Sequence, residues 1–153
     1  MSYVRHILQP GEEVRVIATI HWITYVKGFL FLIVALVLLY YGNNTEHGKS
    51  VWLAASAVIA AIAAILILRA WFHRWITEIA VTNRRVIYKT GFIRRNTVEM
   101  HTDKVESVDI NQSILGRIFN YGDITLVGTG DSHFSNIRTI AHPIELRNQI
   151  TGT

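Results

Sequence analysis

Residues 51–68 read VWLAASAVIAAIAAILIL, a run of eighteen residues without a charged side chain. A helix needs about 20 predominantly apolar residues to cross the roughly 30 Å hydrocarbon core of a bilayer, so the run is nearly long enough by itself. The alternative is a buried helix of a soluble bundle, but such a helix normally carries a polar stripe. Ser56 is the one polar side chain in the run. The run therefore predicts a transmembrane helix over about residues 51–70.

A second apolar segment precedes this run. Residues 29–41 are wholly apolar, and the segment reaches 20 residues when it is extended back to Trp22. The extension includes Lys27, whose long side chain can carry its charge to the interface. We therefore expect a first helix over about residues 22–41. The nine-residue linker that follows, residues 42–50, is short enough to make a helical hairpin of residues 22–72, with both outer ends on one side.

Aromatic and basic residues flank the hairpin. Trp22, Trp71 and Trp75 stand at its outer ends, where tryptophan typically anchors a chain in the headgroup region. The linker holds one basic residue, Lys49, which Glu46 offsets. The outer flanks hold seven basic residues: Arg5, Arg15, Lys27, Arg69, Arg74, Arg84 and Arg85. The positive-inside bias therefore predicts a multi-pass protein of the inner (cytoplasmic) membrane with both termini in the cytoplasm.

Composition excludes several classes of protein. Half of the 153 residues are apolar and 17% are charged, which is unlike a disordered or collagen-like chain. The chain has no cysteine, so it offers no thiolate to a zinc ion or an iron–sulfur cluster and no thiol nucleophile. The seven histidines lack metal-ligand spacing, and no pair of carboxylates suggests acid–base chemistry. We therefore expect no catalytic residue, no metal site and no cofactor.

Beyond the hairpin the sequence changes to short alternating stretches broken by turn residues. Such stretches predict strands, and they cover residues 76–82, 85–90, 92–101, 105–110, 124–129 and 134–141. Apolar residues at helical spacing predict a short helix over residues 113–119 with Ser113 as its N-cap, followed by a turn at residues 120–123. This order predicts a small antiparallel sheet or partly open barrel over residues 73–153.

Two further segments concern the ends of the chain. Pro143 begins a final amphipathic helix whose predicted apolar face consists of Ile144, Leu146 and Ile150. Residues 1–21 form a separate cytoplasmic or interfacial segment in this scheme. Within it, residues 14–20 alternate between apolar and other side chains, which is compatible either with a further strand or with a segment lying along the membrane.

Three stretches carry a resemblance to a known family. They read EIAVTNRRVIY at residues 78–88, DKVESVDIN at 103–111 and QSILGRIFNYGDI at 112–124. They resemble the bacterial pleckstrin-homology-like (PH-like) domains that follow a two-helix membrane hairpin. The resemblance implies a membrane-anchored, mostly-β α+β protein with a bent antiparallel barrel of two sheets and a C-terminal helix. Asn120 stands where family members often have glycine, and asparagine tolerates the left-handed turn. Phosphoinositide binding does not transfer from eukaryotic relatives on fold alone.

Charge and small residues suggest two kinds of partner. Basic residues next to a bilayer attract anionic lipid, and the candidates for a lipid-binding or membrane-surface patch are Arg69, Arg74, Arg84, Arg85 and Lys89. The alternative is that these residues only set topology and solvate the surface. Nucleic acid is not an expected partner, because the basic excess is small and the chain is tethered. Small residues such as Ala57 and Ala61 let membrane helices approach closely, which favours a homo-oligomer or a membrane-protein partner.

These features favour a non-enzymatic, membrane-anchored interaction or scaffold module at the cytoplasmic face, which binds protein partners, its own copies or lipid headgroups. An alternative is an accessory subunit of a larger membrane complex. Another is a lipid-acting enzyme that uses the loop at residues 128–133, where Asp131, Ser132 and His133 stand together. A nucleophilic triad is normally assembled from distant segments, so the glycine-containing loop is more typical of a hairpin turn.

Overall fold

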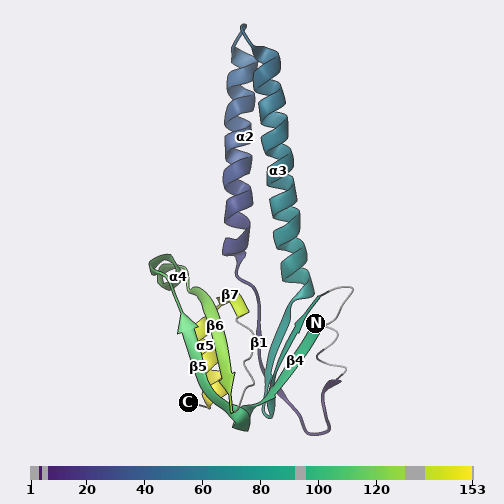
Figure 1. The fold of residues 1–153 in the computed structure, drawn as a ribbon, viewed down its shortest axis with the longest axis vertical. Helices are drawn as coiled ribbons and strands as arrows, with labels where there is room; N and C mark the ends of the chain where they lie inside the picture. The colour runs from purple at the N-terminus through teal and green to yellow at the C-terminus, as the bar shows by residue number, and fades with distance from the viewer. Residues whose placement is uncertain (1–3, 5–6, 92–95, 130–136, 153) are drawn as a thin grey trace. The chain divides into compact units, whose positions relative to one another are not determined.

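The computed structural model describes Val4 and residues 7–91, 96–129 and 137–152 (Figure 1). The chain forms two compact units. One comprises Trp22–His73, and the other, called the domain below, combines Met1–His21 with Arg74–Thr153. The N-terminal segment, which the sequence scheme sets apart, therefore belongs to the same unit as the C-terminal half of the chain.

The first unit is a helical hairpin. It contains η1 (Trp22–Tyr25), α2 (Val26–Asn44) and most of α3 (Lys49–Ile76). Both helical segments are long and apolar enough to cross a membrane by length and composition. Only 11% of the residues in the most apolar window of each are buried, whereas the core helix of a soluble protein would be mostly covered. Both helices extend further into the linker than expected, because four residues, 45–48, separate them rather than nine.

Small residues let α2 and α3 pack closely. The buried residues of α2 are Gly28, Ala35 and Gly42, which are seven residues apart, and those of α3 are Ser56 and Ala63, also seven apart. A spacing of seven keeps one face of a helix against its neighbour. A Cβ atom on Gly28 would lie 2.5 Å from Ile67 Cγ1 and 3.2 Å from the Ile67 backbone nitrogen. Glycine at this position is therefore what allows the close approach.

The domain contains two antiparallel sheets. The first has the order β1 (Val14–Ala18), β2 (Glu78–Thr82), β3 (Arg85–Thr90), β4 (Asn96–His101). The second has the order β5 (Val105–Asn111), β6 (Tyr121–Gly128), β7 (Ile137–Ala141). The segment at residues 14–20, for which the sequence left two possibilities, supplies a strand: Ile17 pairs with Ala80 and Ala18 with Ile79. The helical hairpin is thus inserted between two strands that are neighbours in one sheet.

The core lies between the sheets and the C-terminal helix. Its fully buried members include Ile79 and Val86 from the first sheet and Leu126 and Ile140 from the second. A short 3-10 helix, η2 (Thr102–Lys104), connects β4 to β5. Among the described residues, the bridge between Ile20 and Ile140 is the one isolated β-bridge that joins the sheets. The barrel is therefore not closed.

The C-terminal helix, α5 (Pro143–Thr151), covers the core as expected, with one correction. Pro143, Leu146 and Ile150 are buried, but Ile144 is 49% exposed. Ile144 precedes Leu146 by two positions, and residues two apart on a helix do not share a face. The predicted apolar face was therefore wrong at Ile144.

The short helix expected after β5 is present as α4 (Ile114–Ile118). Ser113 is its N-cap, since the Ser113 hydroxyl accepts a hydrogen bond of 3.1 Å from the Gly116 backbone nitrogen. The turn that follows is shorter than predicted, because β6 already begins at Tyr121. Asn120 makes the turn with a positive φ of 56°, the left-handed geometry expected of it.

Candidate functional site

Two of the basic residues predicted to form a membrane-surface patch, Arg84 and Lys89, lie near opposite ends of the strand pair β2–β3. Arg69 belongs to the hairpin unit. Arg84 is exposed in the turn between β2 and β3, whereas Lys89 pairs with Glu78 near the other end of these strands. At about 3.3 Å per strand residue, Arg84 and Lys89 are about 16 Å apart along β3. Lys89 Nζ also lies 3.9 Å from Glu78 Oε1, so part of its charge is offset.

Arg85 is buried and takes part in a network of polar contacts. Its Nε donates to Glu12 Oε1 and one terminal nitrogen donates to Glu12 Oε2, both at 2.8 Å. The side chain of Arg85 is 11% exposed and that of Glu12 is fully buried. The guanidinium is thus occupied inside the domain, which removes Arg85 from the predicted set of lipid-binding residues.

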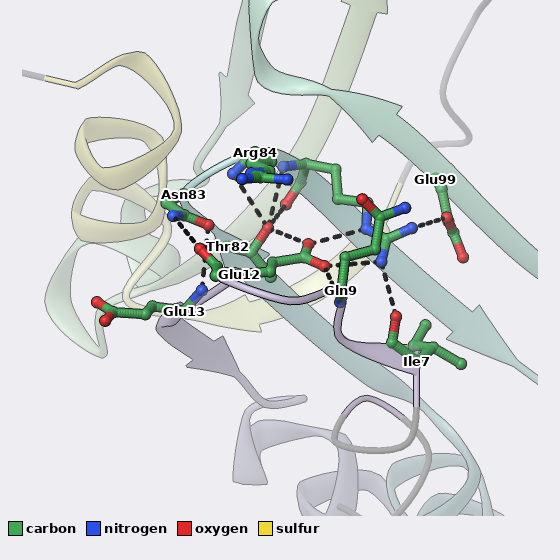
Figure 2. A network of polar contacts seen from close by, with 10 residues as sticks. Ile7, Gln9, Glu12, Glu13, Thr82, Asn83, Arg84 and Glu99 are labelled. Atoms are coloured by element: carbon green, nitrogen blue, oxygen red, sulfur yellow. Dashed lines mark hydrogen bonds and ion pairs between the residues drawn. The ribbon is translucent and has the colours of Figure 1, made fainter.

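Further contacts complete this network. Arg85 donates from its other terminal nitrogen to Glu99 Oε2 at 2.7 Å, and it also donates to the Ile7 carbonyl at 2.8 Å. The Glu12 carboxylate accepts a hydrogen bond from the Thr82 hydroxyl at 2.8 Å and another from the Gln9 backbone nitrogen at 2.9 Å. The network therefore fastens residues 7–12 to the turn between β2 and β3 (Figure 2).

The electrostatics of the pair follow from these contacts. The pKa of Glu12 is lowered to about 2, chiefly by hydrogen bonding to Arg85 and to a smaller extent by the Gln9 and Thr82 donors, against the opposing effect of burial. Hydrogen bonding to Glu12 raises the pKa of Arg85 in return. Both groups remain ionised at neutral pH, and their charges are directed at each other. We interpret the network as a structural joint rather than a ligand site.

A second cluster lies where the chain leaves the domain for η1. His21 is the residue before η1, and its backbone nitrogen donates to the Thr139 carbonyl at 2.8 Å. The His21 ring stacks on Tyr121 with centroids 5.3 Å apart. Burial lowers the pKa of His21, as do the nearby His142 and, less strongly, Arg74, while a hydrogen bond with the Phe119 backbone acts in the opposite direction. We call this end of the domain the exit end.

Helix α4 also lies at the exit end. Phe119 and Tyr121, which both contact His21, follow α4 directly in the sequence. Its large apolar side chains are mostly exposed: Ile114 by 80%, Ile118 by 69% and Leu115 by 57%, with Phe119 next to them at 43%. The apolar spacing predicted the helix correctly. The spacing could not show that this apolar face is left uncovered by the domain.

The remaining predicted site residues lie on the hairpin and at its end. Trp22, Trp71 and Trp75 are each more than half exposed, which agrees with the surface position that an interface anchor requires. Ala57 and Ala61 are exposed on α3, so the contact between α2 and α3 leaves them accessible to another helix. Their role in helix packing stays a prediction.

The chain was compared with known proteins. A family model described as "Bacterial PH domain" matches residues 16–152, from β1 through the hairpin and both sheets into α5. The chain belongs to the bacterial PH domain family. Neither the curated proteins nor the solved structures gave a match. Membership supports a binding or scaffold role for this PH domain and indicates no particular ligand.

Two features of the described part of the PH domain bear on metal and small-substrate binding. Among the residues that the structure describes, no three His, Cys, Asp or Glu side chains are grouped so that they could hold a metal ion. A cleft of about 140 Å³ lies between β1 and the start of α5, which is below the roughly 300–1,000 Å³ of typical ligand pockets. Asp131, Ser132 and His133, the candidates for a lipid-acting enzyme, lie outside the described residues.

Proposed function

We propose that the protein is a non-enzymatic interaction module that its hairpin anchors in the inner membrane, with both termini in the cytoplasm. The observation that carries this proposal is the insertion of the hairpin between β1 and β2. Ala18 and Ile79 pair directly across the sheet, although the whole hairpin separates them in sequence. Both ends of the anchor therefore lead into neighbouring strands of one sheet.

The connections between sheet and anchor are short. Three residues, 19–21, lie between β1 and η1, and Thr77 alone lies between α3 and β2. One extended residue spans at most about 3.6 Å, so the domain is confined to the immediate surface of the bilayer. Confinement raises the effective concentration of a weak binding surface toward membrane partners and lipid headgroups. A domain in this position suits a scaffold.

The exposed face of α3 supports an additional role in assembly. Ala57 and Ala61 are small and accessible, and small residues allow close helix–helix contact in a membrane. A second copy of the chain or another membrane protein is the partner that such a face would fit. The basic residues Arg74 and Arg84 then contribute chiefly through the positive-inside bias.

The topology can be tested directly because the chain contains no cysteine. Single cysteines are introduced by Glu46→Cys in the linker and, as the matched variant, by Glu145→Cys on the exposed side of α5. In spheroplasts, a membrane-impermeant maleimide should label the cysteine at position 46, and it should label that at position 145 only after permeabilisation. Labelling at position 145 in intact spheroplasts, or extraction of the protein from membranes by alkaline carbonate, would contradict the proposal.

A further inference from the structure

We propose that α4 and Phe119 form a membrane-inserting tip that docks the domain on the bilayer; this inference rests on the proposed anchoring. The tip consists of Ile114, Leu115, Ile118 and Phe119. Its apolar side chains would enter the boundary between headgroups and acyl chains, as the apolar face of an interfacial helix does. The hairpin would hold the domain at the membrane, and the tip would set which face of the domain the membrane covers.

The tip presents its apolar side chains on one face. Positions 114, 115, 118 and 119 follow helical spacing, and Gly116, between them, is buried on the other side of α4. A Cβ atom on Gly116 would lie 2.6 Å from the Tyr121 carbonyl oxygen, so α4 is packed tightly on the start of β6. Four large apolar side chains within six residues are thereby held outward. A contiguous exposed patch of this kind typically marks an interaction surface.

The tip is also fixed in its conformation. Ser113 caps the first turn of α4 through the bond to the Gly116 nitrogen. Gln112 Nε2 donates to the Tyr121 carbonyl at 3.0 Å, which ties the residue before the helix to the residue after its turn. Because α4 is formed before it meets its partner, little ordering entropy opposes docking.

The position of the tip identifies the bilayer as its partner. Tyr121 stacks on His21, and the Phe119 backbone contacts the same imidazole. Trp22, which follows His21 in the sequence, begins the first segment that is long and apolar enough to span a membrane. The tip therefore belongs to the end of the domain from which the chain enters the membrane. Figure 1 shows α4 at one end of the second sheet and the C-terminus at the other.

The charge of the tip fits an anionic leaflet. Residues 110–122 contain one charged side chain, Arg117, and no Asp or Glu. Arg117 is exposed on α4 itself, where its charge can reach lipid phosphates while the apolar side chains enter the boundary region. A lipid surface can therefore accommodate both the apolar side chains of the tip and the positive charge of Arg117.

The test uses the full chain, reconstituted in vesicles of phosphatidylcholine and phosphatidylglycerol. An environment-sensitive fluorophore is attached to one introduced cysteine at a time. Leu115→Cys reports on the tip, and Glu106→Cys, exposed near the far end of β5, is the matched control on the domain. Val58→Cys, exposed on α3, reports on the anchor. Lipids that carry a spin label near the headgroup or deeper in the acyl chain serve as quenchers.

We expect the probe at position 115 to show a blue-shifted emission, which the shallow quencher reduces. The probe at position 58 should be strongly quenched, and the probe at position 106 should not be quenched. The double substitution Ile114→Asn, Ile118→Asn should return the emission at position 115 to that of an aqueous probe. Quenching at position 58 without quenching at position 115 would overturn the tip and leave the anchor intact. Absence of quenching at position 58 would overturn both. If the labelled position 115 is not quenched, and the unlabelled Leu115→Cys variant instead forms a disulfide between two chains under oxidising conditions, the tip contacts a second copy of the chain rather than the bilayer.

Discussion

The substitution Glu12→Gln tests whether the buried pair holds the N-terminal segment on the first sheet. The Glu12 carboxylate accepts four hydrogen bonds of 2.8–2.9 Å, two of them from Arg85. Glutamine replaces one acceptor oxygen with an NH2 group, which then faces donors. After this substitution, Glu99 is the remaining acidic partner of Arg85, and the side chain of Glu99 is 37% exposed. Removing one member of a buried pair typically costs about 3–5 kcal/mol.

The pKa of Glu12 gives a second route to the magnitude. Its fall from 4.5 to about 2 corresponds to about 3 kcal/mol, at about 1.4 kcal/mol per unit. We therefore expect Glu12→Gln to destabilise the attachment of β1 by about 3 kcal/mol, which is a large part of the 5–15 kcal/mol that stabilises a typical domain. The contribution of Glu12 is complete above pH 4.5 and is lost as the pH falls from 4.5 toward 2.

A buried thiol can measure this loss. Ala18 is buried in β1, and a thiol introduced by Ala18→Cys reacts only when β1 opens. Glu12→Gln should accelerate the reaction about 100-fold at neutral pH, as expected for about 3 kcal/mol. Glu13→Gln is the matched control, because Glu13 is the exposed neighbour. If the two variants react at rates within about twofold of each other, the pair does not hold β1 and the reasoning from its geometry and charge is wrong.

Three further predictions concern other parts of the chain. Burial lowers the pKa of His21 below 6.5, so the free energy of unfolding should decrease as the pH falls below 6.5. In the His21→Phe variant, the free energy measured by denaturant unfolding should depend less on pH in this range. Ser113→Ala removes the N-cap of α4 and should cost about 1 kcal/mol locally; hydrogen exchange at the Gly116 amide, the donor to Ser113, should accelerate accordingly. The double substitution Ala57→Leu, Ala61→Leu should reduce the mass of the detergent-solubilised assembly, and an unchanged mass would refute assembly through this face.

The sequence predicted those parts of the fold that depend on local pattern. The charge-free run at residues 51–68 identified α3, and the apolar spacing together with Ser113 identified α4 and its cap. The left-handed turn at Asn120 followed from the tolerance of asparagine for positive φ. Each of these signals lies within a few residues of the structure that it predicts.

The rest depends on partners that are distant in sequence. Glu12 and Arg85 are 73 residues apart, so neither could be recognised as half of a buried pair, and Arg85 was instead placed among the candidates for a membrane-surface patch. The strand at residues 14–18 could not be assigned because its partner lies beyond the hairpin. The exposure of α4 likewise depends on what the domain leaves uncovered, which helical spacing does not encode.

The insertion of the hairpin between β1 and β2 also constrains the order of events during synthesis. The ribosome completes β1 first, but Ile79, the partner of Ala18, is synthesised only after both apolar helices have been synthesised. The edge strand β1 therefore has no partner in its sheet until both helices have been synthesised. In the proposed topology, a chain whose second helix did not cross the bilayer would leave β1 and β2 on opposite sides of it, so the pairing of these two strands depends on insertion of the whole hairpin.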